Sequence, residues 1–314
     1  MDRIRKALDR ARLERAQPAM ASAIPKAQAV PKAPSVREAP SVREAPSVRE
    51  PPAVREAASA PEAPAAMPEI GYIPQSVIAS LTSITYTRTR CFTPLPAVLE
   101  ANRVMNPASS DPGAAAYRML RTQVLQRMEA NDWCSLAIFS PGARDGKTTT
   151  AINLAISLAS DRRHTVLLVD FDFKRPRMAA LLGLSPELGG DDVLAGDARV
   201  ENCLYHPEGF DRLTLLPARR TLINSSEVLA GPRSRELVRD LRRRYPERIV
   251  VFDLPPVLNA DDALAFAPLV ECGLVVVAEG GTRRNDLTRA MELLHKTPLV
   301  GTVLNRAADA STGH

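Results

Sequence analysis

The sequence predicts an α/β fold in which a mostly parallel sheet is covered by helices on both faces and preceded by a disordered, proline-rich tether. Short aliphatic runs predict the strands, at residues 135–139, 165–169, 213–216, 249–252, 274–278 and 300–304. The runs are almost continuously apolar, which indicates strands that are buried on both faces. Helical segments separate them, beginning with one over residues 114–130, and this alternation favours parallel strands.

Composition predicts the tether. Residues 17–69 are rich in proline, lack glycine and aromatic residues, and repeat the sequence SVREAP. Proline interrupts helices and removes backbone donors, and the segment has too little apolar area to offset the entropy of ordering it. At about 3.1 Å per residue, an extended linker of this length would reach on the order of 150 Å.

The first residues, 1–16, predict a short basic amphipathic helix. Met1, Ile4, Leu8 and Ala11 fall on one helical stripe, and Lys and Arg outnumber the acidic residues. Such a helix can lie on an anionic membrane or dock into a groove of a partner. A solvated, frayed helix is the alternative, but an isolated helix of this length is marginal in water, which favours the interaction.

The remaining boundaries follow from pattern and composition. Residues 70–110 predict an extended arm, in which the alternating stretch 84–88 fits either an edge strand or an irregular segment. The compact domain is expected over residues 111–308, followed by a tail over 309–314.

Charge and cysteine content exclude several classes of protein. The chain has 314 residues and a formal net charge of +5 of mixed sign, so no nucleic-acid footprint is expected. No apolar run approaches the roughly 18 residues that span a bilayer, and the N-terminus lacks the apolar core of a signal peptide. The cysteines and histidines have neither disulfide-framework nor zinc-ligand spacing. These features predict a cytoplasmic protein.

The segment 135–150, SLAIFSPGARDGKTTT, carries the most specific motif. It combines a buried strand, a tight loop and a helix that starts near Thr148, which is the context of a phosphate-binding P-loop. The loop amides and the helix dipole favour an anion there. Lys147 is expected to reach the β- and γ-phosphates of a nucleotide, and the Thr148 hydroxyl to bind Mg²⁺. An accidental GKT is the alternative, which the complete context disfavours.

One position departs from the strict G-x4-G-K-T pattern. Pro141 stands where the pattern has its first glycine, and a glycine follows at Gly142. Proline has no N–H to donate. The nucleotide contacts are therefore expected from Gly142, Ala143, Arg144, Asp145, Gly146, Lys147, Thr148 and Thr149.

Two other predicted strands end in aspartates. Asp170 and Asp172 follow one buried run, and Asp253 follows another. In open α/β sheets, ligands bind at the carboxyl ends of the strands, so these side chains can gather around the P-loop. One carboxylate, Asp170 or Asp253, can bind Mg²⁺ with Thr148, and another can accept a proton from an attacking hydroxyl. A single aspartate at a strand end more often forms a turn or a cap, so the prediction depends on all three.

With these motifs, residues 117–306 resemble the bacterial tyrosine kinases of polysaccharide export. Their Walker A, A′ and B motifs would be residues 140–149, 167–175 and 249–256. The D-x-D before Arg175 and Pro176, together with D-x-P-P, is specific to this group. The segments KALDRAR, SPG-x-x-DGKT and DLPPVL are most similar to the autokinases of exosortase-associated exopolysaccharide loci. The related partition and division-site ATPases carry a signature lysine at the position of Gly142.

The resemblance implies an ATP- and Mg²⁺-dependent protein-tyrosine autokinase that regulates exopolysaccharide biosynthesis and export. Its catalytic residues would be Lys147, Asp170, Asp172 and Asp253, with Asp170 or Asp172 orienting the tyrosine hydroxyl. Asn305 and Arg306 would lie beside the adenine, although a strand-end turn is the alternative for this segment. The expected partner is a membrane-bound chain-length determinant (copolymerase), the expected assembly a homo-oligomer, and the expected location the cytoplasm, with peripheral membrane contact through residues 1–16.

Two features depart from the family. In its subunit-contact motif, E-x-x-R-x-x-R, Ala115 replaces the glutamate before Arg118 and Arg121. The segment 306–314 has none of the tyrosines expected of a phosphorylated tail, so self-phosphorylation would have to use Tyr72, Tyr86, Tyr117, Tyr205 or Tyr245.

The tyrosine-free segment keeps a second hypothesis open. The chain could be a non-kinase P-loop ATPase switch that controls assembly of the membrane copolymerase, with nucleotide ordering its loops. A small-molecule kinase or ligase on the same frame ranks last, because no substrate motif matches it.

Overall fold

The computed structural model describes residue 86 and residues 89–106, 112–244 and 247–307, all within one compact unit, Ile70–His314. The predicted helix at 1–16, the linker at 17–69 and the tail at 309–314 lie outside the described residues. In the described ranges, no helix has the length and hydropathy to span a bilayer.

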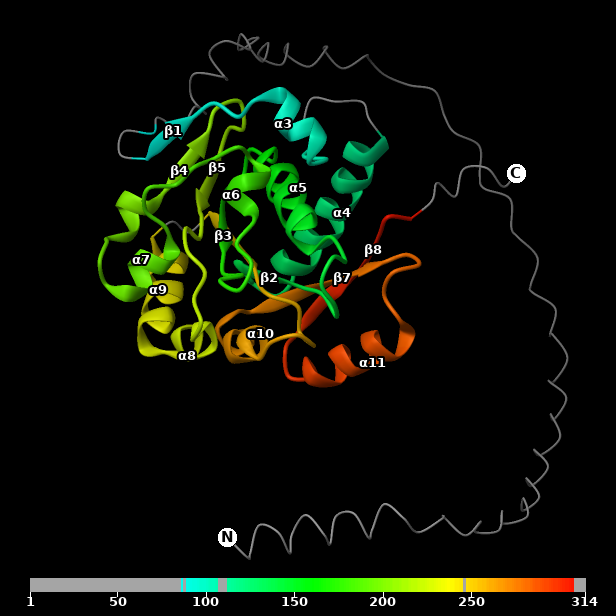
Figure 1. Ribbon diagram of the computed structural model, residues 1–314. Coiled ribbons are helices and arrows are strands. Elements are labelled where there is room, and N and C mark those ends of the chain that lie inside the picture. The colour runs from blue at the N-terminus through cyan, green and yellow to red at the C-terminus, as the bar shows by residue number, and fades with distance from the viewer. Residues whose placement is uncertain (1–85, 87–88, 107–111, 245–246, 308–314) are drawn as a thin grey trace, which may run out of the picture. The chain divides into compact units, whose positions relative to one another are not determined.

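Eight strands of the described residues form one sheet (Figure 1). Their order across the sheet is β1-β4-β5-β3-β6-β2-β7-β8, and every neighbouring pair is parallel except β4 with β5. The strands are β1 (Arg90–Phe92), β2 (Ser135–Phe139), β3 (Thr165–Asp170), β4 (Tyr205–Pro207), β5 (Leu213–Leu216), β6 (Arg248–Asp253), β7 (Cys272–Ala278) and β8 (Leu299–Asn305).

Helices cover both faces of the sheet, as the sequence predicted (Figure 1). One face is covered by α3 (Pro96–Ala101), α4 (Pro112–Glu129), α5 (Lys147–Ala159) and α6 (Met178–Leu181). The other is covered by α7 (Gly190–Ala195), α8 (Ser225–Ala230), α9 (Pro232–Arg243), α10 (Asp262–Phe266) and α11 (Arg284–Leu293). Two short 3₁₀ helices, η1 (Val200–Cys203) and η2 (Ala267–Leu269), complete the helical elements of the described residues.

The central strands are apolar throughout because each contributes to two cores. In β2, Leu136 and Ile138 pack under α4 and α5, whereas Ala137 and Phe139 pack on the opposite face. Successive side chains of a strand point to opposite faces, so a strand covered twice must be apolar at every position. The predicted parallel, doubly covered sheet is therefore confirmed.

Two short strands were missing from the predicted set. β1 and β4 pair in parallel at one edge of the sheet, and β4 runs antiparallel to β5. Both have three residues and little aliphatic content, so no apolar run marks them. Most of the stretch 84–88, predicted as a strand or an irregular arm, lies outside the described residues; the strand itself begins at Arg90.

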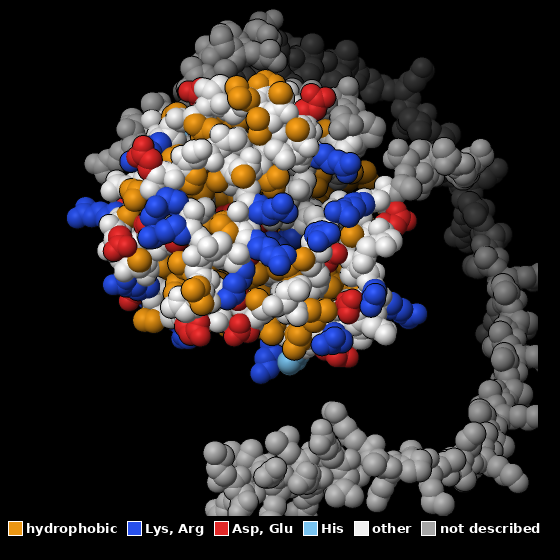
Figure 2. Space-filling view, in the orientation of Figure 1, with side chains coloured by type: hydrophobic (Ala, Val, Ile, Leu, Met, Phe, Trp, Pro, Cys, Tyr) orange, Lys and Arg blue, Asp and Glu red, His pale blue; other side chains and the backbone are white. Residues whose placement is uncertain are grey.

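The surface of the domain carries mixed chemistry. Figure 2 shows hydrophobic, basic and acidic side chains interspersed over the face in view, with basic ones more frequent in its middle. The mixed sign that the composition predicted is visible on this face.

Candidate functional site

The loop between β2 and α5 has the backbone of a P-loop. Helix α5 begins at Lys147, one residue before the predicted start, and Gly146 before it has a φ of +89°. Arg144 also has a positive φ, +70°. A Cβ built on Gly146 would overlap Nδ2 of Asn305, so both the conformation and the space require glycine. Because α5 follows β2 through this loop, the amino end of α5 lies at the carboxyl edge of the sheet. Its free N–H groups favour an anion there.

The structure brings the predicted catalytic side chains together at this edge. Asp170 and Asp253 are register partners in β3 and β6. The Lys147 ammonium donates a hydrogen bond to Oδ1 of Asp253 and lies 3.7 Å from Oδ2 of Asp172. Lys147 and the three aspartates are all buried. We call these four residues the lysine cluster.

The lysine cluster holds more negative than positive charge. One ammonium faces three carboxylates, and burial deprives all of them of water. Burial raises the pKa of Asp170 well above its ordinary value, and the charge of Asp253 adds to the rise while Lys147 opposes it. Burial also raises the pKa of Asp172, again against Lys147. Buried carboxylates with raised pKa values in one cluster are typical of functional sites.

The oxygens of the lysine cluster differ in how they are used. Asp170 accepts main-chain N–H groups on both oxygens, from Asp172 at 3.1 Å and from Met178 at 3.2 Å. Asp253, in contrast, has one oxygen, Oδ2, that is buried without a hydrogen-bond partner among the described residues. Such an oxygen fits a hydrated Mg²⁺, which usually binds one or two carboxylates plus phosphate oxygens. Of the two predicted aspartate ligands, Asp253 is therefore the better placed.

Thr148 follows Lys147 in the first turn of α5 and is half-buried. Among the described residues, no group of three or more His, Cys, Asp or Glu side chains is arranged to hold a metal by itself. A magnesium ion at this edge would therefore depend on nucleotide phosphates and water for most of its ligands, with Asp253 and the Thr148 hydroxyl from the protein.

The other predicted nucleotide contacts lie in the loop or beside it. The Gly142 N–H donates to the Asp145 carboxylate at 2.8 Å, Ala143 and Arg144 are exposed, and Thr149 is half-buried in α5. Asn305 and Arg306 reach the loop from the end of β8: Nδ2 of Asn305 donates to the Asp145 carbonyl oxygen at 2.9 Å. The proposed adenine contact of these two residues stays a prediction, and their observed partners are P-loop carbonyls.

The family's subunit-contact motif lies on α4. Arg121 donates from Nη1 to the Ser157 carbonyl oxygen of α5 at 3.0 Å, so this side chain has an intramolecular role. Ala115 and Arg118 are half-buried on the same helix.

Comparison with known proteins decides the family. A family model described as an AAA domain matches residues 142–278, which include the P-loop from Gly142 onward and all three aspartates. The solved kinase domain of VpsO is 30% identical, with a TM-score of 0.56, and the match covers 62% of this chain and 95% of that one. The chain belongs to the bacterial tyrosine kinase family.

Relatives of this kinase family match over the same domain. Tyrosine-protein kinase YwqD of Bacillus subtilis is 28% identical over 193 residues, which cover 60% of this chain and 79% of YwqD. The succinoglycan biosynthesis transport protein ExoP of Rhizobium meliloti is 29% identical over 218 residues, or 65% of this chain. The chain thus spans most of YwqD but only 26% of ExoP.

Sequence reasoning missed one residue of the site. Thr282, in the turn after β7, donates its hydroxyl to Oδ1 of Asp145 at 2.9 Å. No motif marks it, because the contact joins residues 137 positions apart in the chain.

Proposed function

We propose that the chain is an ATP- and Mg²⁺-dependent protein-tyrosine kinase that regulates exopolysaccharide biosynthesis and export. The observation that carries the proposal is the lysine cluster: a buried Lys147 held between carboxylates at the amino end of α5, in a chain whose relatives are named tyrosine kinases.

Different residues of the site have different roles in the proposed reaction. The P-loop amides and α5 bind the phosphates, and the Lys147 ammonium exchanges a carboxylate oxygen for a phosphate oxygen and balances its charge. Asp253 and the Thr148 hydroxyl are the residues that would then hold the magnesium ion. Bound Mg²⁺ would supply charge neutralisation at the β- and γ-phosphates.

Asp172 is the better candidate than Asp170 to accept the proton of the tyrosine hydroxyl. Asp170 is fully buried with both oxygens occupied by backbone N–H groups, whereas Asp172 is 7% exposed. Burial raises the pKa of both carboxylates, so exposure and hydrogen bonding, and not basicity, separate the two.

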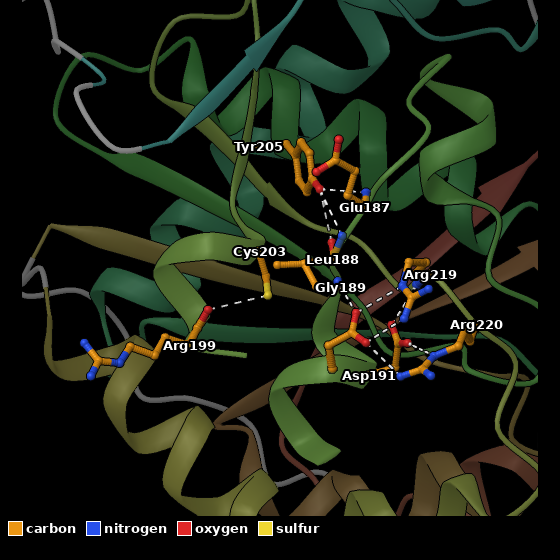
Figure 3. A network of polar contacts seen from close by, with 10 residues as sticks. Glu187, Leu188, Gly189, Asp191, Arg199, Cys203, Tyr205, Arg219 and Arg220 are labelled. Atoms are coloured by element: carbon orange, nitrogen blue, oxygen red, sulfur yellow. Dashed lines mark hydrogen bonds and ion pairs between the residues drawn. The ribbon is translucent and has the colours of Figure 1, made fainter. Parts of the chain in front are cut away.

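The structure limits which tyrosines can accept phosphate. Tyr205 is buried, and its hydroxyl oxygen accepts the N–H groups of Glu187 and Leu188 at 3.0 and 3.3 Å (Figure 3). Tyr86 stacks on His206, and Tyr117 is half-buried against α5. Tyr72 and Tyr245 lie outside the described residues. We therefore expect phosphate on a residue other than Tyr205 or on a partner protein.

The proposed partner is a membrane-bound chain-length determinant or copolymerase, with the kinase at the inner face of the cell membrane. Support comes from the relatives' names, among them a succinoglycan biosynthesis transport protein. The basic residues of segment 1–16 would provide the membrane or partner contact, and the kinase domain would form a homo-oligomer.

The second candidate function is the nucleotide switch without phosphate transfer to protein. One observation favours it: each of the described tyrosines, Tyr86, Tyr117 and Tyr205, is at least partly buried. In this case ATP binding and slow hydrolysis would control assembly with the membrane partner.

One experiment separates the two functions. The full chain is incubated with γ-labelled ATP and Mg²⁺, alone and with membranes, and phosphotyrosine is mapped by mass spectrometry. The kinase predicts tyrosine label that is absent from Lys147→Met and retained by Lys296→Met, which changes an exposed lysine outside the site. Hydrolysis without labelled protein would support the switch instead.

A further inference from the structure

Asp145 joins the P-loop to the turn after β7. Its carboxylate is buried, 5% exposed, and accepts two hydrogen bonds: from the Gly142 N–H on Oδ2 at 2.8 Å and from the Thr282 hydroxyl on Oδ1 at 2.9 Å. The Thr282 oxygen in turn accepts the N–H of Ala278, the last residue of β7, at 2.8 Å. The hydroxyl is thus oriented by the sheet and directed at the loop.

A second connection reaches the same loop from β8. Nδ2 of Asn305 donates to the Asp145 carbonyl oxygen at 2.9 Å, and Nη2 of Arg306 donates to the Arg144 carbonyl oxygen at 2.8 Å. The end of β8 is itself fixed to the end of β7, because the Glu279 N–H donates to the Asn305 carbonyl oxygen at 2.9 Å. Both connections therefore anchor the P-loop to one edge of the sheet.

The loop needs such support. Arg144 is a non-glycine residue with positive φ, and Pro141 cannot donate an N–H at the mouth. Uncommon backbone conformations persist only where the surroundings hold them in place. The remaining amides can bind phosphate only while they keep their common direction.

We propose that Thr282 is a positioning residue for nucleotide binding, which acts through Asp145 to hold the P-loop amides in their phosphate-binding arrangement. The inference rests on the proposed function, since it assigns the ligand as a nucleoside triphosphate. Asn305 and Arg306 form the second support of the same loop.

The test compares two substitutions at one position. Thr282→Val keeps the shape but removes the hydroxyl, and Thr282→Ser keeps the hydroxyl. In the full chain, binding of ATP with Mg²⁺ is measured by displacement of a fluorescent ATP analogue. We expect affinity to fall about tenfold in Thr282→Val and to stay within about twofold in Thr282→Ser. Thr288→Val, an exposed threonine on α11, is the control and should bind as wild type does.

Steady-state ATP hydrolysis provides a readout that loss of stability alone would not produce. A loosened loop weakens ground state and transition state alike, so KM for ATP rises in Thr282→Val while kcat stays within about twofold. If Thr282→Val does not fold, Thr282→Ala carries the same prediction, because it also lacks the hydroxyl and adds no bulk.

Two results overturn the inference while leaving the proposed function intact: unchanged affinity in Thr282→Val, or equal losses in the valine and serine variants. Absence of ATP binding by the folded wild-type chain overturns both the inference and the proposed function.

Discussion

Two groups of buried aspartates in this domain have opposite surroundings. In the lysine cluster, three carboxylates share one ammonium, and an oxygen of Asp253 has no partner among the described residues. At the start of α7, Asp191 and Asp192 instead face two guanidinium groups, Arg219 and Arg220. Figure 3 shows Asp191 beside both arginines. We call this second group the arginine cluster.

Every carboxylate oxygen of the arginine cluster is occupied. Asp191 accepts the Arg219 N–H at 2.8 Å and Nε of Arg220 at 2.9 Å. Asp192 accepts the Gly189 N–H at 2.8 Å and Nη2 of both arginines at 2.7 Å. The hydrogen bond from Arg219 lowers the pKa of Asp192, whereas burial raises the pKa of Asp170 and Asp172. The carboxylates of the arginine cluster are thus matched by cations, whereas those of the lysine cluster outnumber their one cation and leave an oxygen of Asp253 free for a ligand.

One glycine beside each cluster allows the roles of the two clusters to be tested separately. An alanine at position 146 would have to adopt a positive φ, and its methyl group would overlap the Asn305 side chain. An alanine at position 189 would place its methyl group 2.6 Å from the Pro217 carbonyl oxygen. We expect Gly146→Ala to lower ATP affinity about 100-fold and to cost about 1–2 kcal/mol of unfolding free energy, because alanine is strained at a positive φ. Gly189→Ala should cost about 1–3 kcal/mol of unfolding free energy but leave ATP affinity unchanged.

ATP titration and urea unfolding of both variants test this pair. If Gly189→Ala impaired ATP binding in the folded protein as much as Gly146→Ala, the division between the two clusters would be wrong.

Arg219 tests the balance of the arginine cluster. Arg219→Ala removes hydrogen bonds to the buried Asp192, while Arg220 still reaches that carboxylate. Since a buried charge loses part of its compensation, we expect a cost of about 1–3 kcal/mol, measured by urea unfolding. Arg239→Ala, on the exposed side of α9, is the matched control and should change stability by less than about 0.5 kcal/mol. Equal effects of the two substitutions would contradict a structural role for the cluster.

Asp262 is a buried aspartate outside both clusters. It is fully buried in the first turn of α10, and neither carboxylate oxygen has a hydrogen-bond partner in the described part of the chain. Its charge also contributes to the raised pKa of Asp172. We expect Asp262→Asn to stabilise the fold by about 1 kcal/mol at neutral pH, because it removes an unpaired buried charge. Asp261→Asn, at the exposed neighbouring residue, is the control and should have no measurable effect on stability. A loss of stability in Asp262→Asn would contradict the prediction, because it would show that other groups stabilise the Asp262 carboxylate.

The pH dependence of stability should have opposite signs in the two clusters. A raised pKa means that ionised Asp172 destabilises the fold at neutral pH, so Asp172→Asn gains stability there, and the gain fades as pH falls through the raised pKa toward the ordinary value of 3.8. Asp192→Asn should lose stability at neutral pH, and this loss fades only as pH falls below 3.8 through its lowered pKa.

Urea midpoints from pH 7 to the acid limit of folding measure both trends. Curves of the same sign for the two variants would refute the assignment of balanced and unbalanced charge.

Most of the fold was predictable because its signals are local. The strands β2, β3 and β6 are apolar at nearly every position, and double coverage of a sheet demands that pattern. β1 and β4 were missed because an edge strand of three residues needs no apolar run; β4 even contains Pro207.

The residues of the site that belong to sequence motifs were predictable. Lys147, Asp170, Asp172 and Asp253 lie together because the carboxyl ends of parallel strands meet at one edge. The contact of Thr282 with Asp145 depends on how the turn after β7 folds back on the loop, and the sequence has no short-range signal for it. The same limit applies to Asn305, whose amide supports the P-loop carbonyl in the structure.

The P-loop and the lysine cluster together are proposed to form a site for ATP and Mg²⁺. Calorimetric titration of the full chain with ATP in the presence of Mg²⁺ tests it most directly. We expect saturable binding of one nucleotide per chain in the wild type and its loss in a folded Lys147→Met variant. A folded wild-type chain that releases or absorbs no heat at millimolar ATP would contradict it.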